Sequence, residues 1–322
     1  MKKTLLLLGL CLGCSQAAQE PTPGSGAGSQ RFPSLRPASG FPVIIEHRDG
    51  RESRLENSPR AVLPSNAGLV DDLFLLLEPG RVAALPKGSF EYSRLRDLPQ
   101  SPWSMRPIFP RFAAEEVLSQ GPDLVLTNDW QNPESLQILE QNGVPVLSLP
   151  TPASWDEVLT TLRLLGRVTD TEERAQRALE DLEARRQVLL ETQHSGRGLR
   201  VLAYSNFGGG GFTSGQGSTM DMLLSLAGYR NAASEAGLKG ECSLNFEQLL
   251  TIDPDLLLVS RAEDGSSPSA LVLTQRAELA GLAALRSERL VYLHKALFSS
   301  TSSQLIEAAE SLQREVRLLL EE

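Results

Sequence analysis

The feature that most constrains this chain is a pattern that occurs twice, 132 positions apart. Residues 115–127 and 247–259 each begin with Glu, continue as a short helical stretch, and reach a Pro-Asp pair that opens an apolar run. Proline cannot continue a helix, and an apolar run after it is typical of a strand covered on both faces. One such segment is common in α/β proteins, whereas two at equivalent places indicate a duplicated, two-lobed architecture.

The surrounding sequence alternates short apolar segments with helical stretches. The Asp49-Gly50 pair is typical of a hairpin turn. The segments of the first lobe are a strand at 41–47, a strand at 61–63, a helix at 68–77 and a strand at 82–85. This alternation predicts α/β units around mostly parallel sheets, in a first lobe of residues 41–153 and a second lobe of residues 194–322.

A helical segment, residues 154–193, separates the two predicted lobes. Ser154 and Glu157 form a capping box, and a second helix start occurs at Thr169-Asp170. Apolar residues then keep an approximate helical spacing up to about Glu191. We expect a stiff helix that joins the lobes, and a helix within one continuous domain is the alternative.

The first residues are a targeting signal. Lys2 and Lys3 precede an apolar run, residues 5–10, which is far shorter than the roughly 20 residues that span a bilayer. The run ends in Leu-Cys-Leu-Gly-Cys, which resembles the lipobox of bacterial lipoproteins. This predicts a signal peptide at residues 1–14 and lipidation of Cys14. Cys11 and an ordinary cleavage near Ala17-Ala18 are the alternatives.

A segment of low complexity follows the predicted lipid site. Pro, Gly and Ser fill 13 of the 26 positions from 15 to 40, and no hydrophobic period is visible. Such a segment cannot bury enough apolar surface to offset its ordering entropy, so we expect a flexible tether. A tether after a lipid anchor would hold the folded lobes close to a membrane.

Charge and motif content exclude several function classes. Lys and Arg number 31 against 40 Asp and Glu, a net charge of −9 without a long basic run, which argues against nucleic-acid binding. The histidines and Cys242 form no metal-ligand grouping, although His294 or Tyr92 as an axial haem ligand is the less favoured alternative. The glycines at 208–211 lack the lysine of a phosphate-binding loop, and no nucleophile elbow occurs. The sequence therefore predicts no catalytic residues.

Short motifs in both lobes, in this order and spacing, resemble one family. They are residues 63–66, 81–85, 121–125 and 142–146 in the first lobe, and 212–215, 226–231, 254–256 and 289–292 in the second. Together they resemble the single-long-helix substrate-binding proteins of bacterial importers for cobalamin, haem and iron chelates, over residues 58–317. The resemblance implies two Rossmann-like α/β lobes joined by one long helix, with a ligand cleft between them. It also implies a monomer that works with an ABC permease dimer in the periplasm or at the cell surface.

The same resemblance implies a role for the two repeated glutamates. In the family, one glutamate of each lobe pairs with arginines of the permease, and Glu115 and Glu247 stand at the matching positions. The alternative is that each carboxylate only complements the dipole of its helix.

Ligand contacts are expected beyond the carboxyl ends of the strands, where α/β proteins bind their ligands. Strand ends point to Ser65, Asn66, Tyr92, Trp130, Phe207 and Phe298. The family resemblance also implies Tyr92, Trp130 and Phe207, and it adds Phe109, Phe212 and Thr213. Aromatic faces on loops suit a large, flat ligand such as a corrin, porphyrin or chelate. Residues 103–112 and 295–303 depart from the cobalamin branch, so cobalamin, haem and a ferric chelate all stay open as the transported ligand, with no cofactor.

These observations predict a lipid-anchored solute-binding component of an ABC importer. It would capture a cobalamin-like or iron-chelate ligand and deliver it to the permease without covalent chemistry. The alternatives are a receptor or sensor for haem or another metal chelate, and a membrane-tethered enzyme that uses the same cleft.

Overall fold

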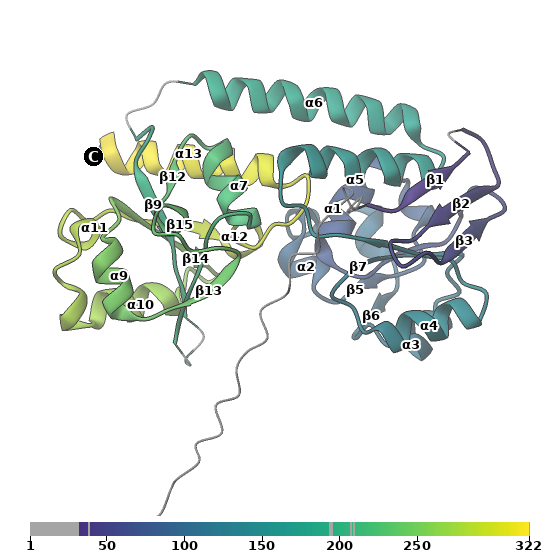
Figure 1. Cartoon of the computed structure of the whole chain (residues 1–322), viewed down its shortest axis with the longest axis horizontal. Coiled ribbons are helices and arrows are strands. Elements are labelled where there is room, and N and C mark those ends of the chain that lie inside the picture. Colours follow the sequence, from purple (N-terminus) through teal and green to yellow (C-terminus); the bar gives the residue numbers. More distant parts are fainter. Residues whose placement is uncertain (1–31, 38, 193–195, 207, 209, 322) are drawn as a thin grey trace, which may run out of the picture. The chain divides into compact units, whose positions relative to one another are not determined.

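The computed structural model describes residues 32–37, 39–192, 196–206, 208 and 210–321 (Figure 1). The predicted signal peptide with Cys11 and Cys14, most of the predicted tether, and Phe207 lie outside the described residues. None of the described helices combines the length and apolar character needed to cross a bilayer.

The first lobe is built on a parallel sheet of strands β4 (Val62–Pro64), β7 (Leu124–Asn128) and β8 (Val146–Leu149), in the order β4-β7-β8. A short parallel pair, β5 (Leu85–Pro86) and β6 (Ile108–Phe109), continues it through a bridge between Val62 and Val82. The apolar residues of β4 and β7 are fully buried, as expected for strands covered on both faces.

The second lobe repeats this plan. Its parallel sheet has the order β12-β9-β14-β15. The strands are β12 (Arg230–Asn231), β9 (Arg200–Ala203), β14 (Leu256–Arg261) and β15 (Leu290–His294). An antiparallel sheet of β10 (Ser205–Asn206), β11 (Gly211–Ser214) and β13 (Glu241–Leu244) stands beside it.

The repeated sequence segments occupy equivalent places in the two sheets. Each forms a helix, α3 (Ala114–Ser119) or α9 (Phe246–Ile252), followed by the strand that pairs with the first strand of its lobe. The aspartate of each Pro-Asp pair binds the start of that neighbouring strand. Asp123 accepts backbone N–H groups of Arg60 and Ala61 at 2.6 and 2.9 Å, and Asp255 accepts that of Arg200 at 2.8 Å. The predicted α/β fold with two related lobes is confirmed.

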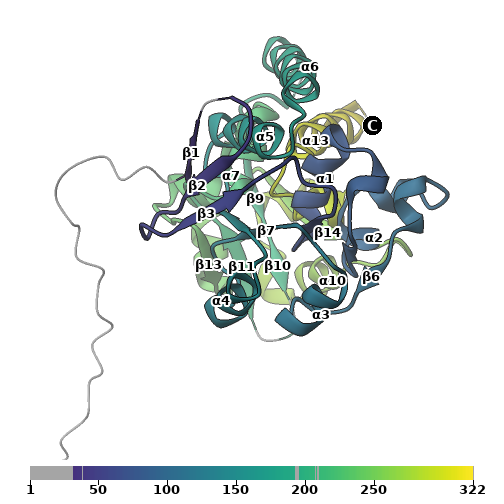
Figure 2. The same ribbon diagram turned by 90° about the vertical axis from the view of Figure 1, so that its right-hand side faces the viewer.

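Helices cover the sheets (Figures 1 and 2). The first lobe carries α1 (Ala67–Leu76), α2 (Ser89–Tyr92) and α4 (Pro133–Gln141). The second lobe carries α7 (Thr219–Leu226), α8 (Ala232–Glu235), α10 (Pro268–Gln275), α11 (Ala283–Arg286), α12 (Lys295–Phe298) and α13 (Leu305–Glu321). Short 3-10 turns lie at Pro79–Arg81, Arg94–Asp97, Pro102–Met105 and Ala277–Leu279.

The predicted helical segment consists of two helices, α5 (Trp155–Val168) and α6 (Glu172–Glu191), and the second begins close to the predicted start at Thr169-Asp170. Ser154 caps α5 as expected, by accepting the N–H of Glu157, but Asp170 adopts a left-handed φ of 58° that ends the first helix. The helices pack closely, because a Cβ at Gly166 would lie 2.5 Å from that of Ala175. Only a glycine permits this approach.

Helix α6 contacts both lobes. It packs on α1 and α5 of the first lobe and on α7 and α13 of the second. Arg185 of α6 forms a two-pronged ion pair with Glu310 of α13, at 2.8 and 2.7 Å. The largest hydrophobic cluster likewise contains residues of both lobes, such as Leu126 of β7 and Leu258 of β14. The lobes therefore contribute to one common hydrophobic cluster, beside a smaller cluster within each lobe.

An antiparallel sheet precedes the first lobe. The predicted hairpin forms from β2 (Val43–Glu46) and β3 (Glu52–Leu55), with Gly50 at a φ of 80°. Strand β1 (Ser34–Arg36) pairs with β2. The prediction of a flexible tether was wrong for Ser34–Arg36, because β2 supplies hydrogen-bond partners that local composition does not reveal.

Candidate functional site

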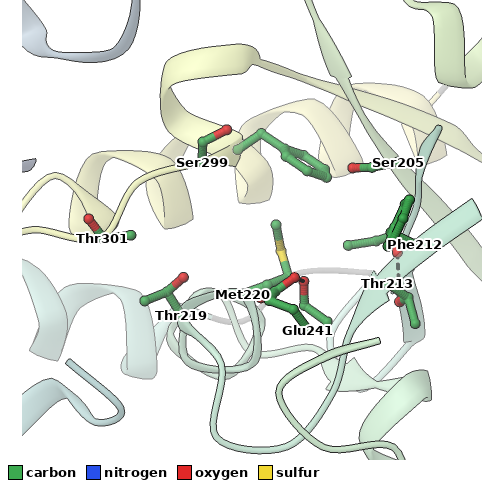
Figure 3. A pocket seen from close by; sticks show the side chains of 11 residues that line it. Ser205, Phe212, Thr213, Thr219, Met220, Glu241, Ser299 and Thr301 are labelled. Carbon is green, nitrogen blue, oxygen red and sulfur yellow. Dashed lines mark hydrogen bonds between the residues drawn. The ribbon is translucent and has the colours of Figure 1, made fainter. Parts of the chain in front are cut away.

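The second lobe contains a cavity of about 350 Å³, here called the C-side cavity (Figure 3). It is lined by aromatic, hydroxyl and thioether side chains and one carboxylate. The lining residues are Ala203, Ser205, Phe212, Thr213, Ser214, Thr219, Met220, Glu241, Phe298, Ser299 and Thr301. Thr213 fixes one wall, because its hydroxyl donates to the Ala203 carbonyl at 2.7 Å and so ties β11 to β9.

A second cavity of about 380 Å³, the N-side cavity, lies against the first lobe. It is lined by Ser65, Asn66, Ala67, Gly68, Asp71, Pro86, Gly88, Tyr92, Asn128, Trp130, Thr151, Ser299, Ser300 and Thr301. Ser65 and Asn66 follow β4, Asn128 ends β7 and Thr151 follows β8, so these side chains gather at the carboxyl ends of parallel strands. The amide of Asn66 donates to Asn128, which joins two of these ends.

The two cavities meet at one short stretch of chain. Ser299 and Thr301, between α12 and α13, line both. This stretch leads into Ser302 and Ser303, which bind two aspartates of α1. The Ser302 hydroxyl lies 3.3 Å from Asp71, and the Ser303 N–H donates to Asp72 at 3.0 Å. The segment between α12 and α13 is thereby attached to α1 of the first lobe.

The two aspartates of α1 are buried, with 1% and 3% of their surface exposed. Burial raises the pKa of Asp71 to about 7, against the opposing effect of the Arg94 guanidinium. Burial also raises the pKa of Asp72 to about 6, although the hydrogen bond from Ser303 acts in the opposite direction. The attachment of the second lobe to α1 therefore includes groups that titrate near neutral pH.

An ion pair and a cation–π contact lie at the edge of the N-side cavity. Lys295 of α12 binds Glu91 of α2 at 2.9 Å, and its ammonium lies 5.2 Å from the centre of the Tyr92 ring. The hydrogen bond to Glu91 raises the pKa of Lys295. These contacts join α12 of the second lobe to α2 of the first.

The structure gathers most of the predicted ligand-binding residues at these cavities. Ser65, Asn66, Tyr92 and Trp130 line the N-side cavity, and Phe212, Thr213 and Phe298 line the C-side cavity. The aromatic faces are accessible, with Trp130 exposed by 62%.

Phe109 is placed elsewhere. Its side chain is 2% exposed and belongs to a hydrophobic cluster of the first lobe, because β6 turns it towards the sheet. We do not include it among the ligand contacts. Phe207 lies outside the described residues.

Sequence reasoning missed several lining residues, of which Glu241 and Met220 are the most informative. Glu241 is on β13, which reaches the cavity by pairing with β11, so no strand end of the main sheet marks it. Met220 stands in the first turn of α7, after the capping residue Ser218. The sequence shows the capping residue, but it does not show which side of α7 faces the cavity.

Glu115 and Glu247 occupy matching positions in the first turns of α3 and α9. Both are exposed, and neither forms a salt bridge with another described residue. No group of three or more His, Cys, Asp or Glu side chains in the described part of the chain is placed to hold a metal ion.

Residues 97–297 match the family described as "Periplasmic binding protein". An uncharacterized ABC transporter substrate-binding lipoprotein, YvrC of Bacillus subtilis (strain 168), is 20% identical over 292 residues, which are 86% of each chain. The vitamin B12-binding protein of Pectobacterium carotovorum subsp. carotovorum (strain PC1) is 26% identical over 166 residues, 50% of this chain and 56% of the relative.

The fold is also that of a solved structure, the periplasmic haem-binding protein RhuT from Roseiflexus sp. RS-1 in its apo form. The TM-score is 0.67 at 21% identity, over 81% of this chain and 98% of that one. The predicted resemblance is confirmed, and the alternative of an enzyme is wrong, because the family consists of binding proteins. This chain belongs to the periplasmic binding protein family, as a solute-binding component of an ABC transporter.

Proposed function

We propose that this protein is a lipid-anchored, monomeric receptor that captures a cobalamin-like or iron-chelate ligand and delivers it to the permease of an importer. The observation that carries this proposal is the pair of cavities that share Ser299 and Thr301, with walls from both lobes. A ligand lying over this segment would touch both lobes at once. A permease that contacts both lobes would thereby respond to whether the ligand is bound.

The lining favours a large ligand with flat, partly apolar faces. Trp130 and Tyr92 offer rings on one side, and Phe212 and Phe298 on the other. Each cavity is near the lower end of the roughly 300–1,000 Å³ range of small-molecule sites, so a ligand that fills both suits a macrocycle or chelate. Relatives that bind vitamin B12 and haem support this class.

Binding is tested by native mass spectrometry and calorimetry with cobalamin, haem and a ferric hydroxamate. Trp130→Leu and Phe212→Leu are each expected to weaken the binding of the preferred ligand about tenfold or more, as for aromatic anchors of an interface. Leu271→Ala, at a side chain that is 54% exposed and outside both cavities, is the matched control. Absence of binding by every ligand of the panel would overturn the proposal.

Docking is assigned to Glu115 and Glu247, one on each lobe. Two carboxylates on separate lobes would let the permease engage both at once. Charge reversal of either, Glu115→Lys or Glu247→Lys, is expected to reduce cellular uptake while leaving ligand affinity unchanged. Glu173→Lys, at an α6 carboxylate with 94% of its side chain exposed, controls for net charge. Uptake that is insensitive to both reversals would contradict the docking role, and binding without any uptake would favour a sensor.

The anchor is assigned to Cys14, outside the described residues. Cys14→Ser is expected to move the protein from the membrane fraction to the soluble one and to remove the lipid mass. Cys11→Ser should leave both unchanged. Lipid attached in the Cys14 variant, or an N-terminus near Ala18, would show that another residue begins the mature chain.

A further inference from the structure

The charge of the cavity linings narrows the class of ligand. The C-side cavity carries the carboxylate of Glu241, and the N-side cavity carries Asp71, whose pKa of about 7 leaves it partly protonated at neutral pH. No lysine, arginine or histidine lines either cavity in the part of the chain that the structure describes. The remaining polar groups are hydroxyls and amides, which carry no charge.

Glu241 is held in place without being neutralised. It stands on β13 opposite Ser214 of β11, and the Ser214 hydroxyl donates to Oε2 at 2.7 Å. A carboxylate offers about four acceptor positions, so one hydroxyl leaves most of them available. No described cation forms a salt bridge with it. In Figure 3 Glu241 and Met220 lie together on one side of the cavity, facing Ser299 across it.

The cationic side chains near the cavities do not cancel the negative charge of Glu241. Lys295 lies against Tyr92 at the edge of the N-side cavity, but Glu91 pairs with it. Arg94 lies against Asp71 and is its partner. Lys239 is close to Glu241 in sequence, yet it is exposed and does not line the cavity.

The geometry points to Glu241 as a specificity-determining residue that accepts hydrogen bonds from the rim of the ligand and disfavours ligands whose rim carries carboxylates. This inference rests on the proposed function, because it concerns the same site. The site would select a macrocycle or chelate whose rim is neutral or cationic and carries donors such as amides. A carboxylate brought beside Glu241 would meet like charge without a compensating cation, and it would lose hydration as well.

The test compares two probes that differ in rim charge and in two ester methyl groups, iron protoporphyrin with two carboxylates and its dimethyl ester, so the decisive quantity is the change in their affinity ratio on Glu241→Gln. Dissociation constants for the two are measured on the full mature chain, together with that for cobalamin, which carries neutral amides. Wild type is expected to bind the ester about fivefold to tenfold more tightly than the diacid, the effect of one like-charge contact in a partly solvated site. The ratio on wild type needs no variant, so it does not depend on how a mutant folds.

Glu241→Gln keeps the shape of the side chain and removes its charge. It should bring the ester-to-diacid ratio close to one and weaken cobalamin about fivefold, because a carboxylate is the stronger acceptor. Glu173→Gln removes the same charge from exposed α6 and should leave all three constants unchanged. Equal or tighter binding of the diacid by wild type, or an unchanged ratio in Glu241→Gln, would overturn this inference while leaving the proposed function intact. If wild type binds none of these probes, the inference fails, and the proposed function fails with it when the ferric hydroxamate is not bound either.

Discussion

The two lobes follow one backbone path but secure it with different side chains. After α3 the chain turns through Gly121 at a φ of 64°, and after α9 it turns through Asp253 at a φ of 40°. Proline and aspartate follow in both, and the aspartate binds the start of the adjacent strand. The repeated spacing thus specifies a left-handed turn between helix and strand, rather than a particular set of contacts.

The differences at this turn are local. In the first lobe, glycine supplies the positive φ, and Asp123 alone accepts two N–H groups. In the second lobe, the carboxylate of Asp253 accepts the N–H of Ala283, and the Arg200 guanidinium donates to the Asp253 and Ile252 carbonyls. The second turn therefore tolerates a non-glycine residue, because added hydrogen bonds offset its backbone strain.

A larger difference lies in how each lobe approaches the cavities. The first lobe presents strand ends with amides and aromatic rings. The second lobe adds the antiparallel sheet β10-β11-β13, which supplies Phe212 and Glu241. A duplicated framework thereby provides two chemically distinct walls.

The largest expected effect is a dependence of stability on pH that arises from the two buried aspartates of α1. The aspartate of α7 serves for comparison, because it makes its contacts within one lobe. Asp71 and Asp72 bind the segment from the second lobe, whereas Asp221 of α7 binds Asn231 and Ser234 within its own lobe. The folded state keeps protons on Asp71 and Asp72, with pKa values of about 7 and 6, that the unfolded chain releases near pH 4. The contribution of these two groups to stability is thus complete below about pH 4 and is lost as the pH rises through 6 and 7. Urea unfolding should give a free energy lower at pH 8 than at pH 5 by on the order of 3 kcal/mol.

Variants separate this effect from other titrations. Burial lowers the pKa of His47, which destabilises the fold at acidic pH and so acts in the opposite direction. Asp71→Asn should flatten the pH dependence, because it removes the buried group with the higher raised pKa of the two. A stability that rises from pH 5 to pH 8 in wild type, with the same slope in Asp71→Asn, would refute the role of this attachment.

The second effect concerns the antiparallel sheet of the second lobe. A Cβ at Gly215 would lie 2.1 Å from the Leu238 carbonyl oxygen, whereas one at Gly88 of the first lobe would meet nothing closer than Tyr92 at 3.8 Å. Gly215→Ala should cost about 2 kcal/mol or more, because the backbone must move apart. Gly88→Ala should change stability by less than about 0.5 kcal/mol. Thermal unfolding measures both costs, and equal costs would show that the surroundings of Gly215 and Gly88 are packed equally closely.

The third effect compares Asp123 with Asp255. Asp123→Ala removes the acceptor for two N–H groups, at a cost of about 1.5 kcal/mol, and Asp255→Ala removes one, at a cost of about half of that. Chemical denaturation of both variants gives the ratio. A larger loss of stability for Asp255→Ala would contradict this comparison. It would mean that the hydrogen bonds of the Arg200 guanidinium do not hold the second turn when the Asp255 carboxylate is removed.

The smallest effect exchanges the turn residues themselves. Gly121→Ala places a side chain at positive φ and should cost about 1 kcal/mol. Asp253→Gly should be nearly neutral, since relief of strain and loss of the bond to Ala283 are each worth about 1 kcal/mol. Clear destabilisation by Asp253→Gly would show that the hydrogen bond exceeds the strain.

Several residues that line the two cavities could be named from the sequence, because ligand positions in α/β lobes are expected at strand ends. Ser65, Asn66 and Trp130 were found in this way, since an apolar run locates the strand and the next residues lie at its carboxyl end. Phe109 was carried over from the family resemblance, but the short strand β6 buries it. Burial depends on what packs against a residue, which local pattern does not reveal.

What the sequence by itself determined is the duplicated α/β plan, since a helix, a proline and an apolar strand are local properties of the chain. Only the tertiary structure decided that residues of both lobes join one hydrophobic cluster and that Glu241 lines a cavity. The physical reason is distance along the chain. Contacts such as Asp72 with Ser303 join residues far apart in sequence, and their energies depend on packing that no short window contains.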